Sequence, residues 1–151
     1  MRQQSKVKVP VRNVVIGGDK PLICLPLVAK TTAELLAEAE MLVSLSPDML
    51  EWRIDAFTKV DDLAECLDAQ KKLRAVIGDI PLIYTCRIDL EGGMAKMDQG
   101  YRKTLIEAAI SEGSIDLVDI ELCNEEDFIS SIKNKTQECG VKLILSYHHF
   151  T

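Results

Sequence analysis

The stretch Leu82-Ile83-Tyr84-Thr85-Cys86-Arg87 is a short apolar run that ends on a charged residue. Continuous apolar runs of this length are typical of strands in parallel sheets that helices cover. Similar runs recur along the chain and predict five strands, at Leu22–Leu27, Met49–Ile54, Leu82–Arg87, Leu117–Leu122 and Lys142–His148. Because their starts recur at the spacing of βαβ units, the sequence predicts a parallel α/β sheet.

Segments with apolar residues at helical spacing lie between the predicted strands. They predict helices at residues 31–46, 61–77, 98–112 and 124–138. Thr31 and Glu34 have the spacing of a capping box at the start of the first helix. Asp61 and Asn124 are candidate N-terminal caps of the second and fourth helices.

A short β-hairpin is predicted before the repeating part, from Val7–Val11 and Val14–Ile16. The loop after the first parallel strand, at residues 26–30, contains no glycine, so the fingerprint of dinucleotide-binding sheets is absent. Charged residues follow several different strands, which favours a barrel, where many loops meet at one mouth. We expect one domain over residues 1–151, with the hairpin and its loop at 1–20 and four βα units plus a fifth strand at 21–151.

The composition restricts the partners and the location of the chain. Lys and Arg number 18 and Asp and Glu number 24, for a net charge of −6, which argues against nucleic acid or an anionic membrane surface as partner. No apolar run approaches the ~20 residues of a membrane span. The basic N-terminus is not followed by the apolar core of a secretory signal, so we expect a cytoplasmic location.

The five cysteines show no C-x-x-C spacing. An odd number without such spacing argues against a disulfide framework or a zinc cluster. We therefore expect buried free thiols that pack as small apolar side chains.

Polar residues at the ends of the predicted strands are the candidate functional residues. Side chains alternate along a strand, so Glu51 and Arg53 share one face. Such a pair could hold substrate hydroxyl groups, or it could be a structural ion pair. Arg87 ends the next strand and could add a polar anchor. Asp119 and Glu121 also share a face, either as interior hydrogen-bonding carboxylates or in a packing or solubility role.

His148 follows the last apolar run, and an imidazole can accept and return a proton near neutral pH. Its neighbour His149 points to the opposite face of the strand, so the two are not expected to bind one metal ion. Glu91 could bind one ring nitrogen of His148 and fix its tautomer, although a purely structural histidine is the alternative. Gly92-Gly93 could form a turn, a mobile loop or an anion-binding nest, but no lysine-bearing phosphate loop accompanies them.

In their order and spacing, several motifs together resemble the type I 3-dehydroquinate dehydratases, the Schiff-base enzymes of the shikimate pathway of aromatic amino acid biosynthesis. The motifs are Glu51–Asp55, Thr85–Arg87, Glu91–Gly93, Asp119–Leu122 and Ser146–His148. The resemblance implies a (β/α)8 TIM barrel with the site at its mouth and the hairpin covering the opposite end. It also implies a lyase that converts 3-dehydroquinate to 3-dehydroshikimate and water.

The resemblance assigns roles to individual residues. His148 would be the general acid/base with Glu91 as its partner, and Glu51, Arg53 and Arg87 would contact the substrate hydroxyl groups. A lysine imine with the substrate ketone serves the family as electron sink, so no metal or external cofactor is implied.

Three features depart from the family pattern. His149 stands where the family usually has Asp, and Ile88-Asp89-Leu90 stands where it usually has Ser-Ala-Lys. In the family, the imine-forming lysine lies on the sixth strand of the barrel, and the arginine that binds the substrate carboxylate comes later in the sequence. No lysine of this chain has a matching position. Lys142 starts the histidine strand at the wrong end.

These departures lead us to expect about the first half of the barrel, inactive on its own. Its unpaired strand edges and exposed core should favour self-association, so we expect a homo-oligomer. Two alternatives stay open. One is a non-catalytic half-barrel module that acts through assembly, and the other is a different Schiff-base lyase or aldolase with a barrel fold.

Overall fold

A parallel sheet forms the centre of the computed structural model, which describes residues 5–149. Its five strands are β3 (Cys24–Leu27), β4 (Met49–Arg53), β5 (Leu82–Thr85), β6 (Leu117–Glu121) and β7 (Lys142–Ser146). Neighbours in the sheet are neighbours in the sequence, and every pair is parallel. The five predicted strands are confirmed, although β3 begins two residues later than expected and the other four end one or two residues earlier.

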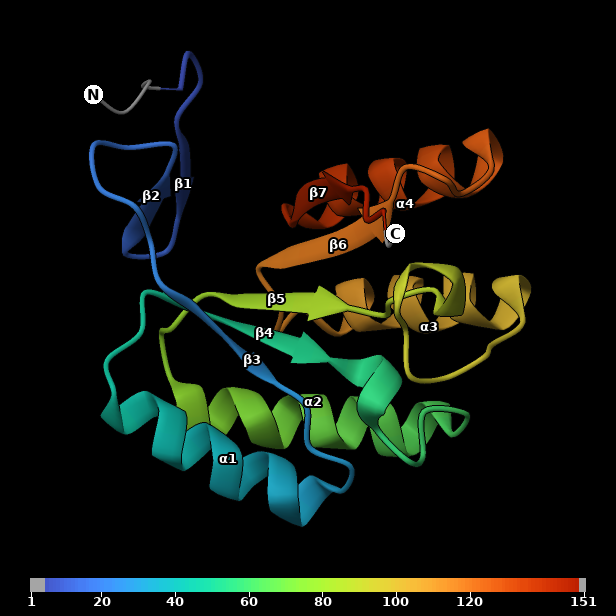
Figure 1. Ribbon diagram of the computed structural model, residues 1–151, viewed down its shortest axis with the longest axis horizontal. Coiled ribbons are helices and arrows are strands. Elements are labelled where there is room, and N and C mark those ends of the chain that lie inside the picture. Colours follow the sequence, from blue (N-terminus) through green and yellow to red (C-terminus); the bar gives the residue numbers. More distant parts are fainter. Residues whose placement is uncertain (1–4, 150–151) are drawn as a thin grey trace.

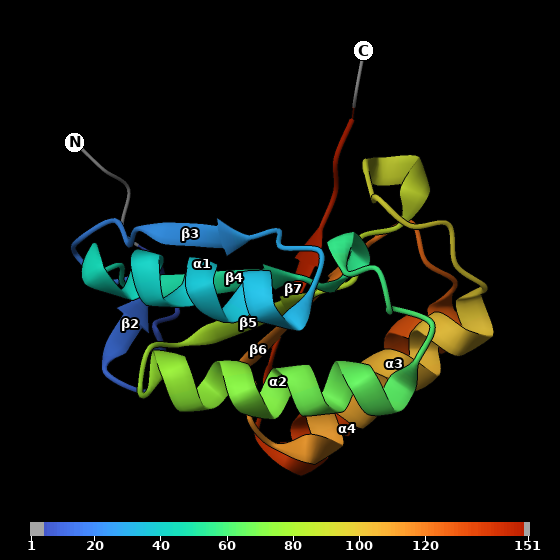
Figure 2. The same cartoon turned by 90° about the horizontal axis from the view of Figure 1, so that it is seen from below.

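Four helices connect the strands and lie on one face of the sheet (Figures 1 and 2). They are α1 (Thr32–Ser44), α2 (Leu63–Ile77), α3 (Gln99–Glu112) and α4 (Glu126–Cys139), with short 3-10 turns η1 (Ile54–Ala56) and η2 (Asp89–Glu91). Right-handed crossovers between strands in sequential order put every helix on the same side. This is the arrangement of a (β/α) barrel, whereas a doubly wound sheet carries helices on both faces. None of the helices described between residues 5 and 149 is both long and apolar enough to cross a membrane.

Local signals explain how the helices begin, with two corrections to the predicted caps. Thr31 caps α1 and forms the full capping box. Asp62 caps α2, and the prediction of Asp61 is wrong because that residue belongs to the preceding turn. Asn124 does not cap α4, because Glu125 holds the cap position and the side-chain oxygen of Asn124 accepts from Arg102, while its amide donates to Glu121.

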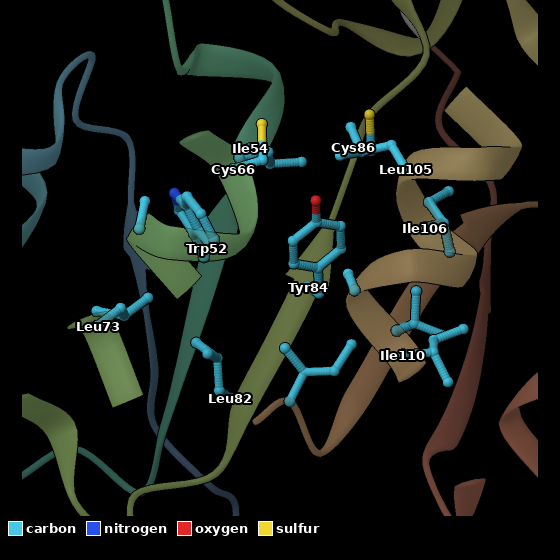
Figure 3. Close-up of a cluster of buried hydrophobic side chains, with 14 of the residues drawn as sticks. Trp52, Ile54, Cys66, Leu73, Leu82, Tyr84, Cys86, Leu105, Ile106 and Ile110 are labelled. Carbon is cyan, nitrogen blue, oxygen red and sulfur yellow. The ribbon is translucent and has the colours of Figure 1, made fainter. Parts of the chain in front are cut away.

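The main hydrophobic core lies between the helices and the outer face of the sheet. Alternation along the strands puts Leu50 and Trp52 of β4 beside Leu82 and Tyr84 of β5 on this face, and all four are buried. Figure 3 shows Trp52 and Tyr84 between the side chains of α2 and α3. Their rings meet edge to face, with centroids 5.6 Å apart. Two aromatic rings therefore fill the centre of this layer.

The hairpin covers the amino end of the inner face of the sheet. It consists of β1 (Val9–Val11) and β2 (Val14–Ile16), which pair antiparallel. Val11 packs with Met49 and Leu117 in a second, smaller apolar cluster. The hairpin predicted from the sequence is thus confirmed, and it leaves only the carboxyl end of the inner face for polar residues.

The cysteines are less buried than the composition suggested. Cys66 and Cys86 are buried, and burial raises the pKa of each thiol to about 12. Cys24, Cys123 and Cys139 are exposed, so the expectation of burial is wrong for these three. They lie in the outermost strand β3, in the loop after β6 and at the last residue of α4, where little of the chain covers them.

Asp116 ties the hairpin to the amino end of the sheet. One carboxylate oxygen accepts from Arg12 Nε of the hairpin turn at 2.6 Å. The other accepts from Arg74 Nη2 of α2 at 2.7 Å and from the N–H of Leu82 in β5 at 2.9 Å. Three separate segments thus depend on one carboxylate.

We expect Asp116→Asn to lower the free energy of unfolding by about 1–3 kcal/mol, because charged hydrogen bonds to two arginines are lost. Urea denaturation followed by circular dichroism measures the change. Asp68→Asn is the control, since Asp68 makes only an exposed pair with Lys72 on α2 and should cost about 0–1 kcal/mol. Equal losses in the two variants would contradict a special role for Asp116.

Candidate active site

The polar ends of β4 to β7 gather at the carboxyl edge of the sheet, together with the loop that follows β5 (Figure 1). Parallel strands in register bring their carboxyl ends to one edge. The register pairs Arg53 with Thr85 and Thr85 with Asp119, and it pairs Glu121 with Ser146. Residues that are far apart in the sequence therefore share one short rim.

His148 and Glu91 form a direct pair at this rim. Nδ1 of the His148 ring lies 2.9 Å from Oε2 of Glu91, and the backbone N–H of His148 donates to the same oxygen at 2.9 Å. The Glu91 side chain is 6% exposed and that of His148 is 37% exposed. One carboxylate therefore orients both the ring and the main chain of a histidine that still reaches solvent.

The pairing assigns the tautomer of His148. An ionised carboxylate can only accept, so Nδ1 carries the proton when the ring is neutral. Nε2 then holds the lone pair and is the nitrogen available as a base. The proximity predicted for His148 and Glu91 is confirmed, whereas their catalytic roles remain a prediction.

The Glu91 carboxyl has an altered acidity. Burial by itself raises its pKa, but hydrogen bonds from the His148 ring, the Cys123 thiol and the His148 N–H outweigh burial and place the pKa below the ordinary value of 4.5. Burial and the contact with Glu91 raise the pKa of the Cys123 thiol. Glu91 is therefore a carboxylate at neutral pH and accepts the hydrogen bonds from His148 as a charged group.

The turn that carries Glu91 depends on two glycines. Gly92 has a positive φ of 87°, which only glycine adopts without strain. A Cβ on Gly93 would lie 2.1 Å from the carbonyl oxygen of Arg87, so this position has no room for a side chain. Gly92-Gly93 therefore form a tight turn, as one of the sequence-based alternatives proposed.

Arg53 lies beside this turn and is held by a buried carboxylate. Its Nε and Nη2 donate to the two oxygens of Asp55 at 2.9 and 2.7 Å. Nη2 also approaches the carbonyl oxygen of Gly92 at 3.4 Å. The pKa of Arg53 is raised above its ordinary value, mainly by the hydrogen bonds to Asp55. The charge of Glu51, a partly buried residue two positions earlier on the strand, acts in the same direction with a smaller effect.

Arg87 lies in a separate buried cluster at the ends of β6 and β7. Its Nη1 donates to Oε1 of Glu121 at 2.9 Å and to Oγ of Ser146 at 2.7 Å, and it is 2.9 Å from Oδ1 of Asp119. Burial raises the pKa of Asp119, although Ser146 and Arg87 act in the opposite direction. Asp119 and Glu121 are thus interior hydrogen-bonding carboxylates, the first of the two alternatives for this pair.

Arg102 of α3 is a site-supporting residue that the sequence analysis missed. It is 1% exposed, and its Nη2 bonds to Glu121 while its Nε donates to the carbonyl of Cys86 at 2.8 Å. Its guanidinium also lies over the ring of Phe128, 5.1 Å from the centroid. The signal was available, because Arg102 falls on the same helical stripe as the buried Leu105.

The described residues contain no group of three or more His, Cys, Asp or Glu side chains arranged to hold a metal ion. His149 is exposed, whereas the His148 ring bonds to Glu91. The arrangement suits proton transfer between a histidine and a bound small molecule.

Comparison with known proteins gives a consistent result over nearly the whole chain. Residues 23–151 match the family model described as "Type I 3-dehydroquinase". The 3-dehydroquinate dehydratase of Geobacillus kaustophilus is 41% identical over 147 residues, which is 97% of this chain and 57% of the relative. That of Syntrophotalea carbinolica is 39% identical over 142 residues, 94% of this chain and 56% of the relative. The chain thus spans little more than half the length of these relatives.

Solved structures show the same fold. The crystal structure of the Geobacillus kaustophilus enzyme superposes with a TM-score of 0.94 at 40% identity, covering 97% of this chain and 57% of that chain. A type I 3-dehydroquinate dehydratase from Clostridium difficile superposes with a TM-score of 0.95 at 36% identity, covering 97% and 58%. The predicted fold class, part of a (β/α)8 barrel, is therefore confirmed.

The lowered pKa of Glu91 leads to a pH-dependent stability. Because the pKa is lower in the folded than in the unfolded chain, the unfolded chain binds more protons at acidic pH. The contribution of Glu91 is therefore present above the ordinary pKa and lost as the pH falls through the folded value. We expect the difference in unfolding free energy between the wild-type chain and Glu91→Gln to shrink on acidification, in urea titrations from about pH 7 to pH 3.

His148→Ala is the informative companion to this variant. It removes the ring donor but keeps the backbone donor to Glu91, so part of the pH dependence should remain. A wild-type to Glu91→Gln difference that is constant across this pH range would contradict the assignment.

Proposed function

The chain belongs to the type I 3-dehydroquinase family, and on that premise we propose that it carries the acid/base and hydroxyl-binding part of a 3-dehydroquinate dehydratase site. One observation supports this most directly. The ring of His148 is bound by Glu91, and the carbonyl of the next residue, Gly92, lies against Arg53. A proton-transfer group and a candidate hydroxyl-binding group thus meet at a single turn.

His148 would act as the general acid/base of the elimination. Its Nε2 would take the proton from the carbon next to the substrate ketone, and the carbon–carbon double bond would form as the β-hydroxyl group leaves. The leaving hydroxyl would receive the proton from the same ring and depart as water, so that 3-dehydroshikimate and water account for all atoms. Positioned proton transfer of this kind contributes typically ~10²–10⁴-fold to a rate.

Glu51, Arg53 and Arg87 would contact the hydroxyl groups of the substrate. The Glu51 side chain is partly buried and lies on the same face as Arg53. Asp55 engages Nε and Nη2 of Arg53, which leaves Nη1 for a substrate oxygen. The side-chain contacts of Arg87 with Glu121, Asp119 and Ser146 all use Nη1, which leaves its other donors for the same purpose.

The elimination also requires an imine-forming lysine, which we propose lies outside these five strands. Lys142 begins β7 and so lies at the amino end of the sheet, away from His148. An imine draws electrons from the adjacent carbon and makes its proton acidic enough for a histidine to remove. The 151-residue chain on its own would therefore bind substrate weakly and turn it over little or not at all.

A role in assembly is the second candidate, and the edges of the sheet favour it. Among the strands of residues 5–149, β3 and β7 each pair with a single neighbour. Ile23 just before β3 and Leu145 in β7 are exposed apolar side chains at these edges. We propose that a second copy of the chain, or a polypeptide that supplies the remaining strands, pairs there. A single domain and a cytoplasmic location, as the sequence predicts, are part of the same proposal.

We expect borohydride added to the chain and 3-dehydroquinate to leave no specific covalent adduct by mass spectrometry, and no ultraviolet absorbance of the conjugated product to appear. Adding a polypeptide with the sixth to eighth strands of a relative should restore both the adduct and the turnover. In that mixture, His148→Ala should lower turnover by about 10²–10⁴-fold. Arg53→Ala should weaken substrate binding.

An adduct on the 151-residue chain alone would contradict the proposal that the imine-forming lysine lies outside the five strands. The exposed Lys30 and Lys96 follow strand ends on the carboxyl side and are the residues to inspect first. Their replacement by Arg would then show which lysine had reacted. A mixture that binds 3-dehydroquinate but gives no dehydration would contradict the proposed reaction.

We further expect light scattering at micromolar concentration to report a dimer or a larger assembly, because the edges of β3 and β7 are unpaired. Leu145→Lys puts a charge on the exposed edge strand and should shift the equilibrium toward the monomer. Ser111→Lys, at an exposed position of α3 between α2 and α4, should not. A wild-type chain that stays monomeric and binds no hydrophobic dye would contradict the proposal.

A further inference from the structure

We propose that Asp55 is a positioning residue that couples the hydroxyl-binding arginine, Arg53, to the turn that holds Glu91 against His148. The coupling is a property of the folded chain and can be measured without substrate. Its importance for the reaction rests on the function proposed above.

Asp55 is a buried carboxylate that accepts from four donors. It is 2% exposed. Oδ1 accepts from Arg53 Nε at 2.9 Å and from the N–H of Arg87 at 3.2 Å. Oδ2 accepts from Arg53 Nη2 at 2.7 Å and from the N–H of Met94 at 3.0 Å. Each oxygen thus binds one side-chain donor and one backbone donor.

The two backbone donors lie at the two ends of the Glu91 turn. Arg87 precedes the turn and Met94 follows it, so the carboxylate of Asp55 holds the two ends of the loop together. Inside the loop, the N–H groups of Glu91 and Gly93 donate to the carbonyl of Ile88 at 3.0 and 2.9 Å. The position of the Glu91 carboxylate therefore depends on a residue of η1, the turn that follows β4.

The same carboxylate sets the direction of the Arg53 guanidinium. Two parallel hydrogen bonds between a guanidinium and a carboxylate fix the plane of the guanidinium as well as its distance. Arg53 Nη2 in turn approaches the carbonyl of Gly92 inside the loop at 3.4 Å. A displacement of Asp55 would therefore move the arginine and the loop together.

Asp55→Asn is the direct test, because the amide has the shape of the carboxylate but lacks its charge and one of its acceptors. The amide NH2 would replace one of the two carboxylate oxygens and cannot accept a hydrogen bond. If it replaces Oδ2, Arg53 Nη2 and the N–H of Met94 lose their acceptor. If it replaces Oδ1, Arg53 Nε and the N–H of Arg87 lose theirs. We expect the loop to loosen and Glu91 to lose part of its hydrogen bonding to His148 and Cys123. The pKa of Glu91 should then rise.

The measurement is an NMR titration of the Glu91 side-chain carboxyl in chain labelled with 13C-glutamate, without ligand. Glu91→Gln assigns the signal. The matched control is Asp116→Asn, which removes a carboxylate with two arginine partners and a backbone partner at the opposite end of the sheet. Asp55→Asn should raise the Glu91 titration midpoint, and Asp116→Asn should leave it at the wild-type value. A general loss of stability would affect both variants alike.

Arg53→Lys is a second variant in case Asp55→Asn does not fold. It leaves Asp55 and its two backbone donors but replaces the bidentate pair and the contact with Gly92. It should also raise the Glu91 midpoint, and by less than Asp55→Asn. A Glu91 midpoint that matches the wild-type value in every folded variant would overturn the proposal.

Binding of 3-dehydroquinate, followed by the same spectra, separates this inference from the proposed function. Asp55→Asn should weaken binding by about 10–100-fold, the effect of losing a charged hydrogen bond that orients a binding group. If the wild-type chain mixed with a polypeptide that supplies the sixth to eighth strands binds no 3-dehydroquinate, but Asp55→Asn still moves the Glu91 midpoint in the chain alone, the proposed function fails and the positioning role stands. If the wild-type chain binds and Asp55→Asn binds equally well, the positioning role fails.

Discussion

The desolvation of carboxylates is the constraint on which the carboxyl edge of the sheet depends. Glu121 is completely buried, and its two oxygens accept from Arg87, the N–H of Ile88, Arg102 and Asn124. A buried carboxylate is tolerated only when charged and neutral donors replace its water. Those donors come from the end of β5, from α3 and from the loop before α4. The need to satisfy one charge therefore brings three segments to the end of β6.

The two ends of the sheet use this chemistry for different purposes. At the amino end, Asp116 binds Arg12 and Arg74 beside an apolar cluster that the hairpin covers, and the result is a closed, stable base. At the carboxyl end, Asp55 and Glu121 bind arginines beside a histidine that remains partly exposed. Stability and chemistry are thus separated along the strands, as in barrels with their sites at the carboxyl ends of the strands.

Sequence alone predicted the elements that depend on local pattern. The apolar runs gave the strands, and Thr31 with Glu34 gave the start of α1, because both signals lie within a few residues. The pairing of Glu91 with His148 was proposed from residue type at the strand ends, and the resemblance implied the same pair. Asp55 lies in the motif Glu51–Asp55, but no sequence signal indicated its contacts, since its backbone partners Arg87 and Met94 belong to another segment.

For two further residues, the structure differs from what the neighbouring sequence predicts. Asn124 has the right type for a helix cap, but its side-chain oxygen, the atom that a cap needs, accepts from the charged guanidinium of Arg102 instead. Arg102 has the spacing of a core residue, but its type suggests the surface, and its burial is explained by acceptors after β5, at the end of β6 and in the loop before α4. In both cases a tertiary contact overrides a local preference.

The sequential order of the strands also bears on how the chain is made: as each new strand leaves the ribosome, the strand beside which it pairs has already been synthesised. One βα unit after another can therefore dock during synthesis.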